Sequence, residues 1–202
     1  MRPVFALALV ALVALAGCTP KVPFYDYKLE EQDPYGKELV LGVGDSLAIN
    51  VWENKEFNTE ATIRSDGKIT MPLIGDLKAG GETPSSLKAQ IKMKLADYVK
   101  SPTGTELVTI AVKAWRSYKF TIQGEVSRQG VFSSDSFVRV AEAIAMAGGL
   151  SRFARKSEIK IFRVDPKTKK TREIPLDYGK ITSGKRMDMN VWILAGDVIN
   201  VP

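Results

Sequence analysis

The chain has 202 residues, of which 29 are Lys or Arg and 23 are Asp or Glu, so its formal net charge is +6. It contains no histidine and one cysteine. These numbers exclude Ser-His-Asp and Cys-His nucleophiles, histidine-ligated metals, internal disulfides, cysteine zinc clusters and iron–sulfur sites. Hydrophobic residues make up 45% and charged residues 26% of the chain, a balance typical of one or two small globular domains. We expect no cofactor, no metal and no enzyme activity, although Lys, Asp, Glu and Tyr remain available for acid–base chemistry.

The N-terminus carries the pattern of an export signal. Arg2 precedes an apolar run of 13 residues from Val4 to Ala16. This run is shorter than the roughly 20 residues of a membrane-spanning helix and matches the hydrophobic region of a signal peptide. It leads into the sequence LAGC, which resembles the bacterial lipoprotein signal box, where cleavage precedes the cysteine and its thiol is acylated. We predict a lipoprotein signal peptide over residues 1–17 and lipidation at Cys18; the alternative is a plain secretory signal with a buried cysteine nearby.

A lipidated cysteine has consequences for location. One acyl chain gives marginal membrane binding, so a diacylated Cys18 supplies the second chain that stable attachment needs. Thr19 follows the cysteine, whereas the inner-membrane retention signal of such lipoproteins is usually Asp at that position. The resemblance therefore implies a protein anchored by lipid in the cell outer membrane and facing the periplasm. The export signal disfavours nucleic acid as a partner.

Residues 18–36 are predicted to be a lipidated N-terminal linker, because proline interrupts both helices and central strands. The segment holds three prolines and three neighbouring aromatic residues: Pro20, Pro23, Pro34, Phe24, Tyr25 and Tyr27. Two interpretations stay open. The aromatic side chains pack on a domain or a neighbouring subunit, or the segment is a solvated tether.

Residues 37–116 are predicted to form a first α+β domain. Strand-like runs occur at residues 39–41, 47–52 and 108–115. Asp66-Gly67 between residues 62–65 and 68–71 indicates a type I′ hairpin, and Pro72 to Gly81 is predicted to be a loop. A helix is predicted over about residues 84–99, with Thr83 as N-cap, Pro84 at the first helical position, and an apolar stripe. The stripe consists of Leu87, Ile91 and Leu95.

Residues 117–202 are predicted to form a second α+β domain. Alternating runs predict strands at residues 120–124, 131–132, 159–164, 171–176, 191–194 and 198–201. Residues 137–147 are predicted to form a short apolar helix that ends at Gly148-Gly149. Gly44-Asp45 and Gly196-Asp197 echo each other, and a turn ahead of a buried strand explains both.

Two other features have competing interpretations. Gly44-Asp45-Ser46-Leu47 spells the nucleophile motif of GDSL hydrolases, but a serine nucleophile needs a general base, usually histidine, so we interpret it as a turn. Residues 151–186 carry 12 basic and 4 acidic residues. An anionic partner or an ordinary solvated surface both explain this basic segment, and its orientation toward a lumen is left open.

These pieces, in order, resemble the outer-membrane polysaccharide export lipoproteins of Gram-negative bacteria, which carry capsule or exopolysaccharide to the surface. In the first domain the matching signature residues are Gly44, Asp45, Trp52, Asp66, Gly67, Pro72 and Gly75. In the second domain, which resembles the family's soluble-ligand-binding β-grasp domain, they are Gly124, Gly130, Gly148, Gly149, Gly196 and Asp197. We expect these turn residues to be structural, with no catalytic residue.

The resemblance implies a non-catalytic, periplasmic, outer-membrane-anchored ring component of a polysaccharide export channel. The implied partners are the polysaccharide, further copies in a homo-oligomeric ring, an inner-membrane polysaccharide co-polymerase and the outer membrane through the lipid. Well-known members add a second β-grasp domain and a C-terminal pore helix, whereas this sequence stops at Pro202. It therefore resembles a short member that works with a separate outer-membrane β-barrel.

Two rival functions remain. A periplasmic glycan-binding module or sensor without channel activity fits the β-grasp domain and the basic segment. A polysaccharide lyase or glycosidase is less well supported, because glycosidases need two carboxylates set across the sugar and no spacing here singles out a pair.

Overall fold

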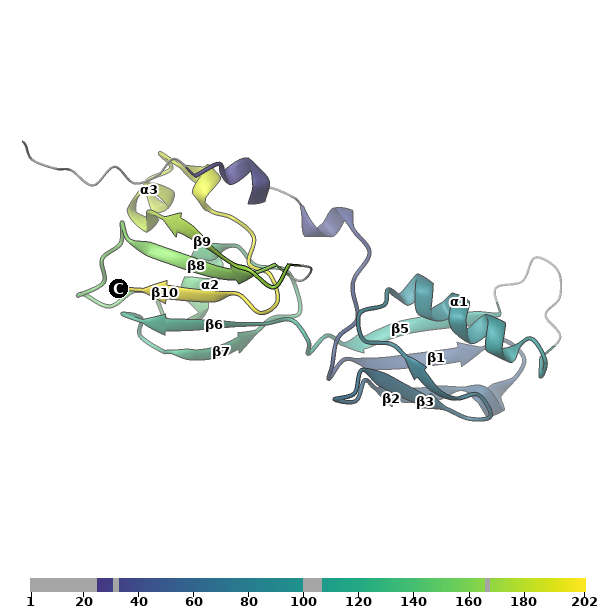
Figure 1. The fold of residues 1–202 in the computed structure, drawn as a ribbon. Coiled ribbons are helices and arrows are strands. Elements are labelled where there is room, and N and C mark those ends of the chain that lie inside the picture. The colour runs from purple at the N-terminus through teal and green to yellow at the C-terminus, as the bar shows by residue number, and fades with distance from the viewer. Residues whose placement is uncertain (1–24, 31–32, 100–106, 166–167) are drawn as a thin grey trace, which may run out of the picture.

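A computed structural model describes residues 25–30, 33–99, 107–165 and 168–202. The predicted signal peptide and the predicted lipidation site Cys18 lie outside these ranges. Figure 1 shows two bodies, each built on a β-sheet, and the described chain passes between them twice. The first passage follows residue 36 and the second surrounds residue 117.

The first body is built around a three-stranded antiparallel sheet in the order β2-β1-β5. A separate hairpin, β3-β4, and one helix complete it. The elements are β1 (Ser46–Val51), β2 (Thr59–Thr62), β3 (Lys68–Met71), β4 (Gly75–Lys78), α1 (Pro84–Leu95) and β5 (Val108–Ala114). The strands predicted around residues 47–52 and from residue 108 are confirmed as β1 and β5.

Helix α1 follows its sequence signals closely. The Thr83 hydroxyl accepts a hydrogen bond from the Ser86 N–H at 3.2 Å, which satisfies one of the helix's unpaired amides. All three residues of the predicted apolar stripe are fully buried. The helix ends at Leu95, earlier than the predicted residue 99, because residues 96–98 form a turn.

The second body contains a five-stranded sheet in the order β7-β6-β10-β8-β9. The first and last strands, β6 and β10, lie side by side and parallel, and every other pairing is antiparallel. This arrangement, with a helix between β7 and β8, is that of a β-grasp domain. The elements are β6 (Lys119–Gly124), β7 (Gly130–Ser133), α2 (Val140–Met146), β8 (Ile159–Val164), β9 (Thr171–Leu176), α3 (Tyr178–Thr182) and β10 (Val198–Val201).

Each body has a hydrophobic core of its own. The first core draws on residues from Leu41 to Val108, and the second on residues from Tyr118 to Val201 together with Tyr27. The α+β fold class with two small mixed domains is therefore confirmed. Tyr27 belongs to a short 3₁₀ helix, η1 (Tyr27–Glu30), which packs beside β9 and another 3₁₀ helix, η4 (Met187–Met189) (Figure 1). In sequence order, η1 contacts the second body, the next residues form the first body, and the remaining residues form the rest of the second body.

The predicted type I′ hairpin is wrong. A type I′ turn needs positive φ at both central residues, and only Gly67 has it, at 76°. The Arg64 N–H donates to the Lys68 carbonyl and closes a turn, but β2 pairs with β1 while β3 pairs with β4. The predicted loop from Pro72 to Gly81 therefore contains a strand, β4.

Three other boundaries differ from prediction because local backbone groups find other partners. Residues 39–41 form no strand; the Leu41 N–H donates to Glu82 and its carbonyl accepts from Gly81. Helix α2 begins three residues late, because Arg139 forms an isolated β-bridge with Trp192. Residues 191–194 contribute only that bridge instead of a strand.

Candidate functional site

The predicted signature glycines occupy turns that need an unusual backbone. All eight have positive φ, between 69° and 146°: Gly44, Gly67, Gly75, Gly124, Gly130, Gly148, Gly149 and Gly196. Gly148 and Gly149 close α2, donating N–H groups to Ala145 and Ile144. Gly124 also lies against β10, where a Cβ would come within 2.0 Å of the Val201 carbonyl oxygen. This geometry supports a structural role for the glycines.

The other signature residues lie in different places. Trp52 is 56% exposed just beyond β1, and Pro72 is in the β3–β4 turn. Asp66 makes an exposed ion pair with Arg64 at 2.6 Å. Asp45 and Asp197 are buried, and each is the centre of a polar cluster near the passages between the bodies.

Asp45 joins the first body to the second passage. One carboxylate oxygen accepts the Gly42 N–H at 2.8 Å, and the two oxygens accept the N–H and the hydroxyl of Ser117 at 2.7 and 2.8 Å. Gly42 packs so closely here that a Cβ would come within 2.3 Å of the Ser117 Cβ. Asp45 and Gly42 of the first body thereby hold the backbone that leads into β6.

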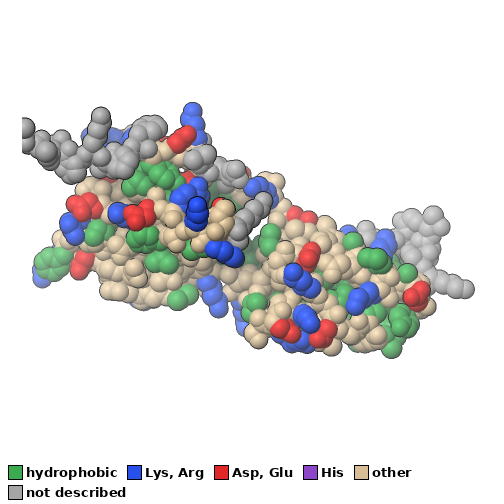
Figure 2. All heavy atoms as spheres, viewed as in Figure 1, with side chains coloured by type: hydrophobic (Ala, Val, Ile, Leu, Met, Phe, Trp, Pro, Cys, Tyr) green, Lys and Arg blue, Asp and Glu red, His purple; other side chains and the backbone are tan. Residues whose placement is uncertain are grey.

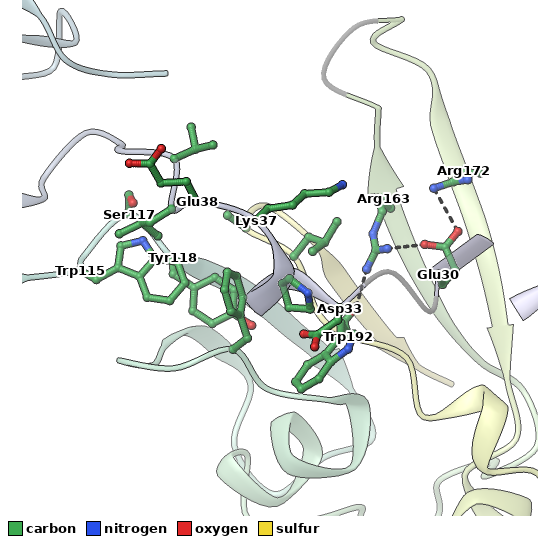
Figure 3. Close-up of a pocket in the computed structure, with 16 residues that line it drawn as sticks. Glu30, Asp33, Lys37, Glu38, Trp115, Ser117, Tyr118, Arg163, Arg172 and Trp192 are labelled. Carbon is green, nitrogen blue, oxygen red and sulfur yellow. Dashed lines mark hydrogen bonds and ion pairs between the residues drawn. The ribbon is translucent and has the colours of Figure 1, made fainter. Parts of the chain in front are cut away.

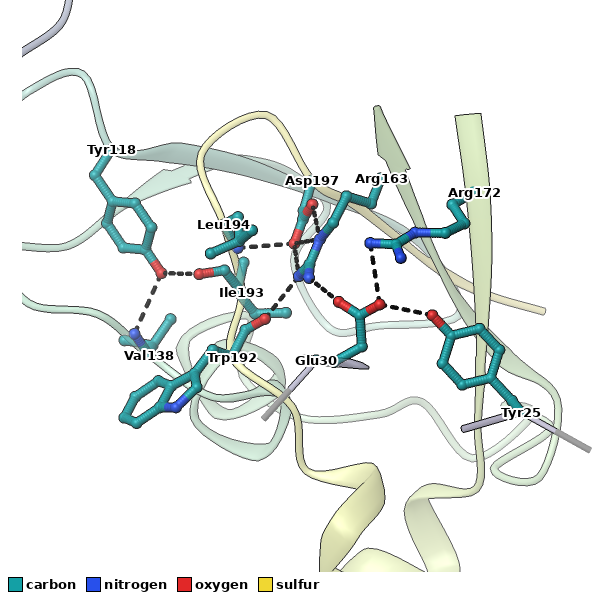
Figure 4. A network of polar contacts seen from close by, with 10 residues as sticks. All are labelled: Tyr25, Glu30, Tyr118, Val138, Arg163, Arg172, Trp192, Ile193, Leu194 and Asp197. Atoms are coloured by element: carbon teal, nitrogen blue, oxygen red, sulfur yellow. Dashed lines mark hydrogen bonds and ion pairs between the residues drawn. The ribbon is translucent and has the colours of Figure 1, made fainter. Parts of the chain in front are cut away.

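A buried ion-pair network holds the N-terminal segment on the second body (Figure 4). Arg163 on β8 donates to both oxygens of Asp197, the closest contact being 2.6 Å, and makes an ion pair with Glu30 on η1. Arg172 on β9 reaches the second oxygen of Glu30 at 3.0 Å, and the Tyr25 hydroxyl donates to that oxygen at 2.7 Å. We call these five residues the Arg163 network.

The network keeps its central cation charged. Burial lowers the pKa of Arg163, but hydrogen bonds to Asp197 and the charge of Glu30 outweigh burial and raise it. Burial and the hydrogen bond to Glu30 raise the pKa of the Tyr25 hydroxyl, which stays protonated as a donor. Among the described residues no buried side-chain nitrogen or oxygen lacks a partner.

A cleft of about 720 Å³ lies between these two clusters (Figure 3). We call it the junction cleft. Its walls come from three parts of the chain: the connecting segment 33–40, the passage 115–118, and the second body. Glu30, Arg163 and Arg172 of the network form one end, and Ser117 borders it near the Asp45 cluster.

Aromatic rings form a continuous series of contacts beside the cleft, and all of them except Tyr35 line it. Trp115 stacks on Tyr118 with centroids 4.8 Å apart and meets Phe137 edge to face at the same distance. Tyr35 contacts Phe137 at 5.3 Å and Trp192 at 5.8 Å. We call these five residues the aromatic series. Their sequence separation explains why sequence reasoning missed them: no local pattern joins residues 35, 115, 137 and 192.

Many basic side chains of the segment 151–186 are paired with carboxylates. Six of its basic residues make ion pairs with carboxylates: Arg155, Lys160, Arg163, Arg172, Lys180 and Arg186. Figure 2 shows basic and acidic side chains interspersed over the visible face. For the five residues among them with exposed side chains an ordinary paired surface is the better interpretation, whereas Arg163 is buried. The described residues contain no group of three His, Cys, Asp or Glu side chains placed to hold a metal ion.

Comparison with known proteins gives two family matches in the same order as the two bodies. A family described as "Polysaccharide biosynthesis/export protein" matches residues 33–113, and one described as "SLBB domain" matches residues 119–174. The chain therefore carries a polysaccharide biosynthesis/export domain followed by an SLBB domain. This confirms the family resemblance seen in the sequence.

Three similar proteins have names of the same kind. The EPS I polysaccharide export outer membrane protein EpsA of Ralstonia solanacearum is 29% identical over 150 residues, 62% of this chain and 38% of that protein. The capsule polysaccharide export protein BexD of Haemophilus influenzae is 27% identical over 128 residues, 54% of this chain and 32% of BexD. The exopolysaccharide production protein ExoF of Rhizobium meliloti is 26% identical over 156 residues, 72% of this chain and 33% of ExoF.

The matched regions span about a third of the length of these relatives. Within the ranges that the structure describes, no helix combines the length and hydropathy needed to cross a bilayer.

Proposed function

We propose that this protein is a component of an outer-membrane polysaccharide export channel, anchored by lipid at Cys18 and facing the periplasm. Copies of the chain form a ring that passes capsule or exopolysaccharide toward the cell surface without catalysis. The observation that carries this proposal is the ordered pair of matched domains, each with a separate core, in a chain similar to proteins named for polysaccharide export.

The sheets suit assembly into a ring. In the two larger sheets of the described residues, the edge strands each have one open side: β2 and β5 in the first body, β7 and β9 in the second. An open strand edge invites pairing with another chain unless it is covered. Head-to-tail contacts between identical subunits close into a ring when the rotation is cyclic, so neighbouring copies would cover such edges. A wide ring of this kind leaves a wet lumen for polymer handed on by an inner-membrane co-polymerase.

The Arg163 network supports an anchoring role for the N-terminal segment. It holds Tyr25, which is seven residues after Cys18 in the sequence. Seven residues span at most about 25 Å, at about 3.6 Å per residue. A lipid on Cys18 would therefore keep the second body within about that distance of the membrane. The contacts of Tyr25 and Glu30 favour the interpretation in which the N-terminal segment packs on a domain over the interpretation in which it is a solvated tether.

The proposal is tested by deleting the gene and measuring polysaccharide both at the cell surface and inside the envelope. We expect loss at the surface, restored by the wild-type gene and not by Cys18→Ala expressed at the same level. Normal surface polymer in a strain without a second copy of the gene would overturn the proposal. Restoration by Cys18→Ala would overturn only the lipid anchor.

The junction cleft favours a second candidate, a periplasmic glycan-binding module that works without a ring. Analytical ultracentrifugation of the mature protein in mild detergent separates the two. Assemblies of several subunits support the channel component, and a monomer that binds glycan saturably at every concentration supports the module.

A further inference from the structure

The junction cleft has the size and lining of a small-molecule site. Its volume of about 720 Å³ lies within the range of about 300–1,000 Å³ typical of ligand pockets. Trp115 and Trp192 line it and remain partly exposed. Both indoles are half-buried against their neighbours, whereas Trp52 of the first body is 56% exposed.

Both indoles are held in place by neighbours. Tyr118 stacks on Trp115 at an interplanar angle of 17°, and the Arg139 guanidinium lies 4.1 Å from the ring centroid of Trp192. Arg139 is itself fixed by donating to the Asn190 carbonyl at 2.7 Å. Rings that are already ordered lose little conformational freedom when a ligand packs on them, which favours binding.

Charged groups around the cleft are balanced. Three acidic and three basic side chains line it: Glu30, Asp33, Glu38, Lys37, Arg163 and Arg172. Glu30, Arg163 and Arg172 already satisfy one another in the network, and Glu38 accepts the Ser85 N–H at 2.8 Å. The cleft therefore offers no surplus of positive charge that would select an anion.

This combination matches the chemistry of an uncharged sugar ring. A pyranose presents a face of C–H groups, which packs on the electron-rich face of an aromatic ring. Its rim of hydroxyls donates and accepts hydrogen bonds, for which a mixed set of carboxylates and cations is suited. Aromatic walls with a few polar groups at fixed positions are typical of such sites.

We propose that the junction cleft binds a short stretch of uncharged pyranose units of the exported polymer, packed against Trp115 and Trp192. The inference rests on the proposed function, because that function supplies the polymer. It adds a specific contact between the chain and its cargo at the junction of the two domains.

The test uses the full mature chain in mild detergent with a defined probe. Oligosaccharides are released by partial acid hydrolysis from the polymer of the parent cells and separated by anion exchange into uncharged and charged fractions. Binding is followed by tryptophan fluorescence in a Trp52→Phe background, which leaves Trp115 and Trp192 as reporters, and checked by calorimetry. We expect the uncharged fraction to bind saturably.

Ala195→Trp is the blocking variant, and binding by the variants with an added tryptophan is measured by calorimetry, because a new indole would change the fluorescence signal. Ala195 is exposed and lines the cleft, so a large side chain there fills the site without removing any core contact. We expect the dissociation constant to rise by about tenfold or more. Ala96→Trp, on an exposed residue after α1, is the matched control and should bind as wild type. Trp192→Leu, with circular dichroism and thermal midpoint as folding checks, provides a second loss of binding.

Several results would overturn the inference: no binding of either fraction, tighter binding of the charged fraction, a polymer that yields no uncharged fraction, or full binding by folded Ala195→Trp. The gene deletion separates this inference from the proposed function. If wild-type protein binds no sugar but deletion abolishes surface polymer, the cleft assignment fails and the export role stands. If the cleft binds sugar but deletion leaves surface polymer normal, the export role fails and the cleft assignment stands.

Discussion

The Gly44-Asp45 and Gly196-Asp197 turns begin in the same way and differ only in what they reach. In both, the glycine has φ near +90°, at 91° and 87°. In both, the aspartate N–H donates to the carbonyl three residues back, and its carboxylate accepts the N–H of that same residue, Gly42 or Leu194, at 2.8 Å. Each aspartate is buried and immediately precedes a strand, β1 after Asp45 and β10 after Asp197.

The partner that completes each carboxylate differs in charge and origin. Asp45 is completed by uncharged donors on Ser117, which lies 72 residues away. Asp197 is completed by the Arg163 guanidinium, which in turn reaches Glu30, 133 residues from Arg163. The same local motif therefore fixes the joint between bodies in one case and the N-terminal segment in the other. Removing the charged partner of Asp197 should therefore lower the free energy of unfolding more than removing an uncharged donor from Asp45.

The largest effect is expected from Arg163→Met. The change removes the cation and leaves the carboxylates of Asp197 and Glu30 buried without it. Breaking a buried ion pair from one side costs about 3–5 kcal/mol, and we expect the free energy of unfolding of the second domain to fall by about that amount. Urea unfolding followed by circular dichroism and tryptophan fluorescence measures it.

Arg155→Met is the matched control for that change. Arg155 pairs with Glu158 on the surface, with its side chain 64% exposed, and exposed pairs contribute about 1 kcal/mol or less. Equal losses for the two variants would show that burial of the Arg163 network does not set its contribution.

A smaller effect is expected from Asp45→Asn. The amide keeps one acceptor but turns an NH₂ group toward backbone N–H donors, so at least one of the three hydrogen bonds is lost. Hydrogen bonds to charged groups contribute about 1.5–3 kcal/mol, and we expect a loss of stability in this range by urea unfolding. Ser117→Ala removes only the hydroxyl donor, so its loss should lie at the lower end of this range, about 1.5 kcal/mol. A larger loss for Ser117→Ala than for Asp45→Asn would contradict this account of the joint.

The two turns also show how far sequence reasoning reaches. Local signals were sufficient for the turns themselves, for the Thr83 cap of α1, and for the Gly148-Gly149 end of α2, because each depends on neighbours within a few residues. The predicted hairpin between residues 62–65 and 68–71 was wrong because the turn signal at Asp66-Gly67 does not specify which strand pairs with β3. In the structure β3 pairs with β4, and β2 pairs with β1.

The Arg163 network and the aromatic series could not be predicted from local sequence patterns. Glu30, Arg163 and Arg172 come from a segment predicted only as a linker and from two strands, and the aromatic series joins four distant parts of the chain. A charged residue on a strand interior was the one available signal: Arg163 sits at an inward position of β8, between Ile161 and the end of an alternating run. An inward arginine requires a buried carboxylate, and that requirement points to a partner without identifying it.

The exposed Arg64 cluster extends the comparison to a carboxylate at the surface. Arg64 makes ion pairs with Asp66 and Asp76 at 2.6 and 2.9 Å, and Thr70 donates to Asp76 at 2.6 Å. Hydrogen bonds from Arg64 and Thr70 lower the pKa of Asp76 to about 2. All of these side chains are well exposed to solvent, so we expect a contribution smaller than that of either buried aspartate.

The pH dependence of Asp76→Asn tests that contrast. Because the pKa of Asp76 is lower in the folded protein than the roughly 3.9 of an unfolded chain, its ionised form favours folding. The stabilisation is complete above about pH 4 and is lost as the pH falls toward 2. Thermal midpoints should therefore differ between wild type and Asp76→Asn at pH 5 and converge near pH 2. In about 1 M NaCl, where the Debye length is about 3 Å, the difference at pH 5 should shrink. A difference that persists in acid and in salt would mean that Asp76 stabilises the hairpin by packing rather than by charge.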